Sequence, residues 1–442
     1  MPFTAPTLTQ AQDALAARLT DPTFVYWTRA ELTTYILEGL RVWNSWTSHW
    51  RARGTFNATQ NEPFYDLPAL LPAERGYTVT NWDLISEIQY ALLEPPTPSA
   101  WSGTSQFTLA DVNSAVVGRR DQFLQQTGAV LTRSVTAHAA PAATGRIDLA
   151  ETTLTVHRAA WRVTATGLLR PLRRTDEYSA NAYSRSWPTQ TTPPSSYSTT
   201  LTPPITLQVI PPPQGAGSLD LLSVERGNQF TNPLVEIALG VPDDWSWVVK
   251  YGALADLLNR DGLALDTERA AYCQQRWEQG IALARVASVV LDARIDGVVA
   301  RVGPLSGADQ YRPLWQLVMG APSQVLLAGQ TIVALAPPPN GNQTILLDVV
   351  RNAPVPSVGA DILQVSADLY DSVLDIAQHA AIFKQGAGQI RAGIQLLERA
   401  AADAGIALQI QQGSQPARKP TLAQTRADDY QQPRTLDPVP VE

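Results

Sequence analysis

Two stretches of the chain repeat one another and decide its fold: QVIPPPQGAGSLDLLSVER at residues 208–226 and ALAPPPNGNQTILLDVVR at residues 334–351. In each, apolar residues lead into three prolines, and a glycine-containing turn leads into a second apolar run that ends in arginine. Since proline is excluded from the middle of a sheet and β-branched runs favour strands, each stretch predicts a pair of strands joined by a turn. The proline triplets start at residues 211 and 337, an offset of 126.

The segments downstream also repeat, which extends the match from strands to helices. VPDDWSWVVKYGALADLLNRDG at 241–262 lines up with VSADLYDSVLDIAQHAAIFKQG at 365–386, at an offset of 124. Each predicts a helix that begins after an acidic residue, Asp244 or Asp368, and ends at a glycine. A strand pair followed by helices, used twice, indicates a duplicated α+β module, and the period is too long for a solenoid.

The predicted fold class is therefore α+β, with a helical N-terminal domain, two duplicated strand-pair and helix modules, and an extended C-terminal tail. Capping signals and helical apolar spacing assign residues 1–145 to the helical domain. Residues 146–300 form the first module, with strands at its start and helices up to residue 300, and residues 301–405 form the shorter second module. Residues 406–442 lack periodicity and have few apolar anchors, which favours an extended or disordered segment.

The composition argues against several classes of protein. With 442 residues, 44% of them apolar and 17% charged, the chain can bury a large core and is not a globally disordered protein. Its net charge of −7 argues against a protein that coats nucleic acid by neutralising phosphates. The single cysteine, Cys273, excludes a disulfide framework within the chain and a cysteine-based zinc site. Without a signal segment or a membrane-length apolar run, we expect a soluble protein from a reducing compartment.

The sequence carries no recognisable catalytic or metal-binding pattern. Its four histidines are isolated: His49, His138, His157 and His379. Without a pair at helical spacing or a Cys/His cluster they predict no metal site, and His379 suits a packed position on a helix. A phosphate-binding loop and a nucleophile-elbow motif are also missing from the sequence. We therefore predict no enzymatic activity, no metal and no cofactor.

Other chemically suggestive residues have simpler structural interpretations. Cys273 lies in a predicted helix, where a buried thiol is more common than a nucleophile. Adjacent Asp243 and Asp244 could form a paired acid site, but at a helix start they favour caps and dipole partners. Four tryptophans gather on or near one helix: Trp27, Trp43, Trp46 and Trp50. Their spacing favours a core or a subunit interface over a glycan-binding platform.

Four stretches resemble the head–tail adaptor, or neck connector, proteins of tailed bacteriophages. They are YWTRAELTTYILEGLRVW (26–43), LTPPITLQVIPPPQGAGSLDLLSVER (201–226), the helix segment at 241–262 and YCQQRWEQGIAL (272–283). The resemblance implies a mostly helical portal-binding end, a ring beneath the portal that is usually a dodecamer, and C-terminal tails that reach into the portal. Typical adaptors have less than half this length, so the duplication and the long tail leave open a further role in the upper tail wall or as a collar for fibres.

The function that the resemblance implies is structural. We expect a virion protein, assembled in the host cytoplasm, that forms a ring at the neck, joins the portal protein to tail or nozzle proteins and lets genome DNA pass without specific binding. A net negative charge suits this role, because attraction to DNA in a channel would slow its movement. We expect the tail to dock on a partner through its sparse anchors: Tyr430, Arg434, Leu436 and Val439.

A second class of function stays open. The tryptophans and strands also suit a tail-associated or surface binding module that recognises glycan or fibre proteins. The C-terminal tail separates the two, because a ring component needs it for docking: loss of residues 413–442 should abolish incorporation into particles but leave a glycan binder unaffected. A virion enzyme that degrades the cell wall is a third possibility, but no acid pair stands at a recognisable motif.

Overall fold

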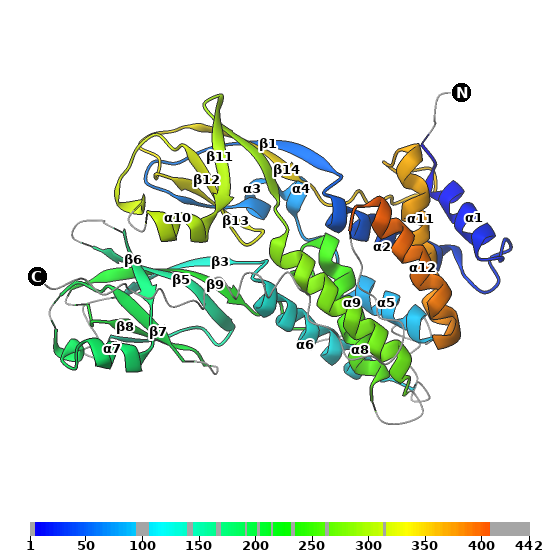
Figure 1. Ribbon diagram of the computed structural model, residues 1–442, viewed down its shortest axis with the longest axis horizontal. Helices are drawn as coiled ribbons and strands as arrows, with labels where there is room; N and C mark the ends of the chain where they lie inside the picture. Colours follow the sequence, from blue (N-terminus) through cyan, green and yellow to red (C-terminus); the bar gives the residue numbers. More distant parts are fainter. Residues whose placement is uncertain are drawn as a thin grey trace, which may run out of the picture. The chain divides into compact units, whose positions relative to one another are not determined.

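The computed structural model describes residues 5–93, 106–138, 145–164, 169–190, 192–200, 204–213, 215–230, 235–260, 265–312 and 315–406. These residues form helices and two seven-stranded sheets, so the predicted α+β class is confirmed (Figure 1). The predicted tail beyond residue 406 lies outside the described residues.

The two sheets share one strand order. The first contains β3 (Thr132–His138), β9 (Gly217–Glu225), β5 (Thr153–Val163), β6 (Leu169–Arg174), β7 (Ser196–Thr199), β8 (Thr206–Ile210) and β4 (Arg146–Asp148), in this spatial order. The second contains β1 (Arg51–Asn57), β14 (Thr344–Val350), β10 (Val290–Ile295), β11 (Val298–Pro304), β12 (Gln324–Ala328), β13 (Ile332–Ala336) and β2 (Phe64–Asp66). Neighbours are antiparallel in both, apart from β6 with β7 and β11 with β12, which are parallel and occupy matching places.

The strands of the repeated stretches form close to their predicted positions, but they are not neighbours. The expected 205–210 and 218–226 are β8 and β9, which lie in one sheet with other strands between them. β8 pairs with β4 and β7, whereas β9 pairs with β3 and β5. The proline-rich connection therefore crosses between two parts of the sheet, because proline lacks the amide hydrogen that a tight hairpin would use.

The longer helices fall into two matching sets. One set contains α5 (Asn81–Leu92), α6 (Leu109–Thr127), α8 (Ser246–Leu258) and α9 (Thr267–Val286). The other contains α1 (Leu8–Arg18), α2 (Arg29–Thr47), α11 (Ala367–Ile382) and α12 (Ala387–Asp403). The second helix packs against the third in each set, and the third against the fourth. Short elements connect the rest: α3 (Leu67–Leu70), α4 (Pro72–Arg75), α7 (Glu177–Tyr183), η2 (Trp187–Thr189), η3 (Asp243–Trp245), α10 (Leu305–Tyr311), η4 (Trp315–Leu317) and η5 (Phe383–Gln385).

Threonine caps show that the duplication includes the N-terminal helices. A threonine hydroxyl accepts the backbone N–H three residues on at the start of all four: Thr7 of α1, Thr28 of α2, Thr80 of α5 and Thr108 of α6. Both α2 and α6 have 19 residues, and both end at a residue in the left-handed conformation, Ser48 (φ 53°) and Gly128 (φ 60°). The repeated unit is therefore two helices, seven strands and two more helices.

One copy is inserted into the other. Copy 1 is continuous over residues 80–286, whereas copy 2 consists of residues 7–66 and 290–403, because β1 and β2 pair in the same sheet as β10 to β14. The predicted ranges 1–145, 146–300 and 301–405 divide the chain differently. Residues up to 300 were expected to be helical, and this is wrong: β10 and β11 form a hairpin there and belong to the second sheet.

Each sheet encloses its own apolar core, and the helices form another. Leu207, Val209 and Leu219 are buried in the first sheet, and Val333, Leu335 and Leu347 in the second. A core or a subunit interface was expected for the four tryptophans at 27, 43, 46 and 50, and all four are buried within the chain, in the core. Aromatic rings of this size contribute the largest apolar areas to a core.

Four charged side chains lie buried between helices of the two copies. Lys250 of α8 in copy 1 contacts Glu38 of α2 in copy 2 and lies 3.6 Å from Glu87 of α5. Arg41 Nη1 of α2 lies 3.4 Å from Glu87 Oε1, whereas Lys250 contacts Glu87 Oε2. All four side chains are 7% exposed or less. The charges of the two acidic and two basic side chains balance. Charged groups are buried in proteins mainly when they are paired in this way.

Replacement of Lys250 should therefore destabilise the protein strongly. Lys250→Met leaves Glu38 and Glu87 buried with Arg41 as their remaining cation, and we expect a loss of about 3–5 kcal/mol in the free energy of unfolding. Urea denaturation measures it. The matched control is Asp13→Ala, which breaks the exposed pair with Arg29 and should cost less than about 1 kcal/mol. A Lys250→Met loss no larger than that of the control would contradict the role of the cluster.

Candidate functional site

The partner-binding residues predicted from the sequence remain a prediction. Tyr430, Arg434, Leu436 and Val439 all lie outside the described residues.

The chemically reactive candidates are part of the packing. Cys273 is fully buried, and burial raises the pKa of its thiol. His379 is also buried, and its Nε2 lies 2.6 Å from the Tyr272 hydroxyl, which agrees with the expected packed position. Burial lowers the pKa of His379 to about 3, and the Arg276 charge acts in the same direction, so the ring is neutral at pH 7. No group of three or more metal-ligating side chains occurs in the described part of the chain.

Asp243 and Asp244 differ from the expected helix caps. Neither carboxylate caps α8, whose first turn has no side-chain cap. Asp243 instead accepts the backbone N–H groups of Thr78 (2.9 Å) and Val79 (3.0 Å), and Asp244 accepts from Asn44 Nδ2 (2.7 Å). Burial raises the pKa of Asp244 to about 6, against the lowering effect of nearby Arg75. The pair ties distant loops to the start of α8.

A polar contact joins the sheets of the two copies. Arg158 of β5 donates to both oxygens of Asp309 of α10, at 2.9 and 3.2 Å. Asp309 also accepts the indole N–H of Trp315, at 3.0 Å. The Arg158 guanidinium lies 5.9 Å from the centre of the Trp315 ring and 5.5 Å from that of Phe64, a cation–π geometry.

Further hydrogen bonds between the two copies involve the backbone of copy 1. The turn between β12 and β13 reaches the end of α6, where Gln330 N donates to Ala129 O at 2.7 Å. Thr331 Oγ1 accepts from Leu131 N (2.9 Å) and donates to Leu131 O (3.0 Å). A Cβ at Gly329 would lie 2.4 Å from Gly128 O, and Gly329 has φ 60°, so only glycine suits this close approach.

We call this set of interactions the copy contact, and its two sides differ. Copy 2 contributes α10, η4 and the β12–β13 turn, whereas copy 1 contributes the C-terminal end of α6, β3 and β5. Arg133 of β3 adds an ion pair to Glu62, in the loop before β2. A contact between unlike faces is heterologous, and it leaves one face of each kind without a partner inside the chain.

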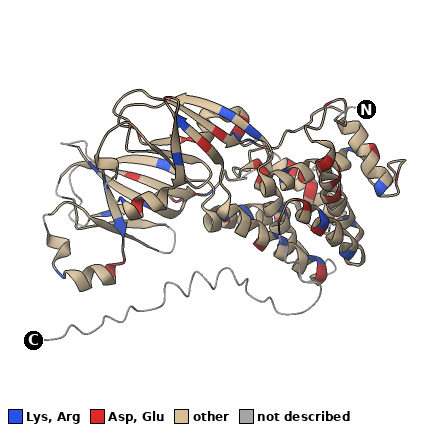
Figure 2. Cartoon of the chain, turned by 45° about the horizontal axis from the view of Figure 1, so that its top comes forward, with Lys and Arg blue, Asp and Glu red and all other residues tan. Residues whose placement is uncertain are grey.

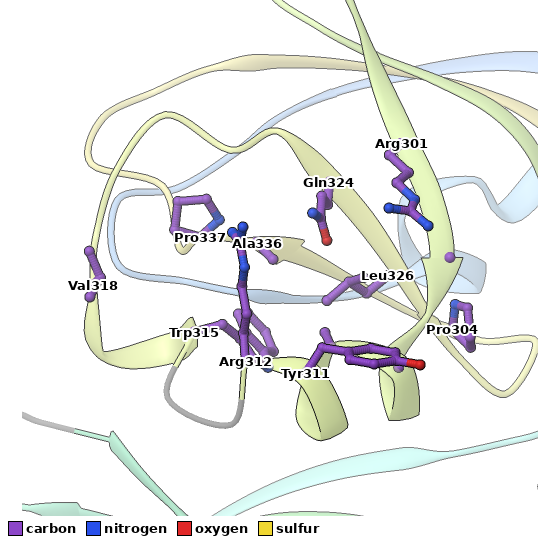
Figure 3. A pocket seen from close by; sticks show the side chains of 13 residues that line it. Arg301, Pro304, Tyr311, Arg312, Trp315, Val318, Gln324, Leu326, Ala336 and Pro337 are labelled. Atoms are coloured by element: carbon purple, nitrogen blue, oxygen red, sulfur yellow. The ribbon is translucent and has the colours of Figure 1, made fainter.

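A surface groove of about 980 Å³ lies beside the copy contact, between β11, α10, η4 and β12 (Figure 3). Arg301, Arg312 and Gln324 supply its polar lining, together with Tyr311, whose side chain is 81% exposed. The described lining residues include no carboxylate or histidine. The groove therefore offers two guanidinium groups, an amide and a phenol on a lining that is otherwise apolar.

The distribution of charge does not favour a nucleic-acid-binding surface. Figure 2 shows basic and acidic residues interspersed on the helices and on the strands of the described chain. Many of them pair with each other, as Arg53 does with Asp348 and Arg119 with Asp256. A protein that grips DNA concentrates lysine and arginine on one face instead.

Comparison of the sequence with models of known protein families and with curated proteins found no match. Within the described residues, no helix combines the length and the apolar character that a bilayer crossing requires.

Sequence reasoning missed the copy contact, although the sequence contains a signal for it. YSRSW at 183–187 and YRPLW at 311–315 share a tyrosine and a tryptophan four residues later. Both stretches lie at the end of a seven-residue helix, α7 or α10. An internal match of this kind between two loops could have identified Trp315 and its counterpart Trp187.

The buried histidine predicts a pH dependence of stability. In the unfolded chain His379 has an ordinary pKa near 6.5, well above its folded value of about 3, so the folded protein binds fewer protons between these pH values. Stability from His379 is therefore complete above about pH 6.5 and is lost as the pH falls towards about 3. His379→Gln keeps a partner for Tyr272 but does not titrate, so it should flatten the decrease of the unfolding free energy between about pH 6.5 and 4. Parallel curves for both proteins would contradict this.

Proposed function

We propose that the chain is a non-enzymatic structural protein of a bacteriophage virion, which forms a ring at the neck, joins the portal protein to tail or nozzle proteins and lets the genome pass. The observation that carries this proposal is the heterologous copy contact. A subunit whose two copies already meet through unlike faces keeps one face of each kind free, which is what a closed ring requires of its subunits.

The resemblance to adaptor proteins supports the same function. The stretch at 26–43 begins before α2 and forms most of that helix, and the stretch at 272–283 lies within α9. Both helices belong to the helical part, which in adaptors is the portal-binding end. The net charge of −7 and the mixing of basic and acidic residues along the described elements (Figure 2) suit a channel through which DNA moves without being held.

The mass of the purified protein tests this proposal, measured by light scattering alone and after mixing with the portal protein of the same particle. We expect a ring of many copies, a dodecamer by the resemblance, either in isolation or once portal is present. A chain that stays monomeric in both conditions would overturn the proposal. Attention would then turn to the groove beside α10 as a site for glycan or fibre proteins, with Tyr311 as its exposed aromatic residue.

The tail gives a second test. Alanine at the four predicted anchors, Tyr430, Arg434, Leu436 and Val439, should abolish incorporation into particles, because a docking tail depends on its few apolar and charged anchors. The matched control places alanine at four neighbouring positions: Gln431, Gln432, Thr435 and Asp437. Incorporation is measured as the copies of the chain per purified particle. Equal incorporation of the two variants would show that the tail does not dock through these anchors.

A further inference from the structure

The copy contact has an unused equivalent on copy 1. α7 is the counterpart of α10, and η2 the counterpart of η4, because each lies between matching strands of the common sheet order. Their internal geometry also agrees. The indole N–H of Trp187 donates to Asn181 Oδ1 at 2.9 Å, and that of Trp315 donates to Asp309 Oδ1 at 3.0 Å, in both cases six residues earlier.

The two equivalent faces differ in what covers them. Trp315 is 6% exposed, with Phe64 and Arg158 against its ring. Trp187 is only half-buried, and among the described residues no arginine or lysine lies over its ring. Around it, Tyr178 is 85% exposed and Tyr183 is 94% exposed. We call α7 and η2 together the free docking face.

The side of the copy contact that copy 1 contributes, formed by the end of α6, β3 and β5, also has an equivalent on copy 2. The matching left-handed ends of α2 and α6 align Ser48 with Gly128, so Arg51 and Arg53 stand where Leu131 and Arg133 stand in copy 1. Both arginines are exposed. We call the surface formed by β1 and β10 the free receiving face.

A strand irregularity completes this alignment. β5 is irregular between Val156 and Arg158, and β10 is irregular between Val290 and Asp292, so Asp292 takes the place of Arg158. Leu291, inside the second irregularity, is 38% exposed. The free receiving face therefore carries Asp292 together with the two arginines, of which Arg53 is paired with Asp348 of β14, the strand between β1 and β10.

We propose that the free docking face of one chain binds the free receiving face of a second copy of the chain, so that the contact between subunits repeats the contact between copies. The residues at the equivalent positions are complementary. Asn181, in the place of Asp309, can donate its amide to Asp292, in the place of Arg158. Asp176 and Glu177, exposed at the start of α7, bring negative charge to the side that meets Arg51 and Arg53. The inference rests on the proposed function only for closure of these contacts into a ring.

Cysteine cross-linking of the full chain tests the pairing. The native Cys273 is fully buried and does not react, so introduced cysteines can be read without background. Asn181→Cys combined with Asp292→Cys, treated with a short bismaleimide, should give a ladder of covalent multimers on a denaturing gel. Each single variant should stop at the monomer or, by linking two identical cysteines, the dimer. Arg158→Cys combined with Asp309→Cys is the matched control, and it should link within one chain.

The outcomes separate this inference from the proposed function. Oligomers by light scattering without a ladder would overturn the inference and leave the ring standing. A ladder without a closed ring would support the inference and count against the ring. A chain that is monomeric with and without portal, and gives no ladder, would overturn both.

A second variant tests the same face without cross-linker. Trp187→Ala should raise the concentration needed for half-maximal assembly at least tenfold, because truncation of a central aromatic residue removes much of the binding energy of an interface. Val25→Ser is the matched control, since Val25 is 82% exposed in the loop between α1 and α2, which is not part of either face. Unfolding curves of both variants should match that of the wild type. An unchanged assembly midpoint for Trp187→Ala would contradict the inference.

Discussion

The buried cluster of Lys250, Glu38, Glu87 and Arg41 is the interaction on which the arrangement of the two copies depends. It joins α8 and α5 of copy 1 to α2 of copy 2, in a place where each charge would be costly alone. Burial raises the pKa of Glu87 to about 7 and the Lys250 charge opposes this rise, so the charged form of Glu87 depends on its basic neighbour. Such a cluster specifies one way of packing the helices, and the sheet-to-sheet copy contact is built on that packing.

The insertion of copy 1 into copy 2 is a second constraint on how far the two copies can separate. Two connections, at residues 67–79 and 287–289, link the copies, so their separation would require both to move. Residues of copy 1 also hold loops outside it: Asp243 binds Thr78 and Asn352, and Asp244 binds the backbone N–H of Ala353. The chain therefore contains two similar halves that are joined twice, and each half keeps one face that its twin uses internally.

Local patterns predicted the elements, and long-range pairing decided how they combine. The prolines and the apolar runs located β8, β9, β13 and β14, and the acidic starts located α8 and α11, because these signals lie within a few residues. The pairing of β1 with β14 joins residues almost 300 apart, as Arg51 with Val350, and no local signal reports it. The Arg158–Asp309 bond spans 151 residues, so the copy contact was hidden for the same reason. The partner-binding anchors in the tail were predicted from the composition of that segment alone.

The duplication and the proposed ring lead to one distinctive expectation about symmetry. If the contact between subunits repeats the contact within them, a ring contains twice as many equivalent sheet lobes as chains, at even spacing. Electron microscopy of the protein bound to its portal measures this directly, from averaged views down the ring axis. We predict evenly spaced lobes in twice the number of subunits. Lobes in unequally spaced pairs would show that subunits meet through a different surface, and the absence of any ring would contradict the account as a whole.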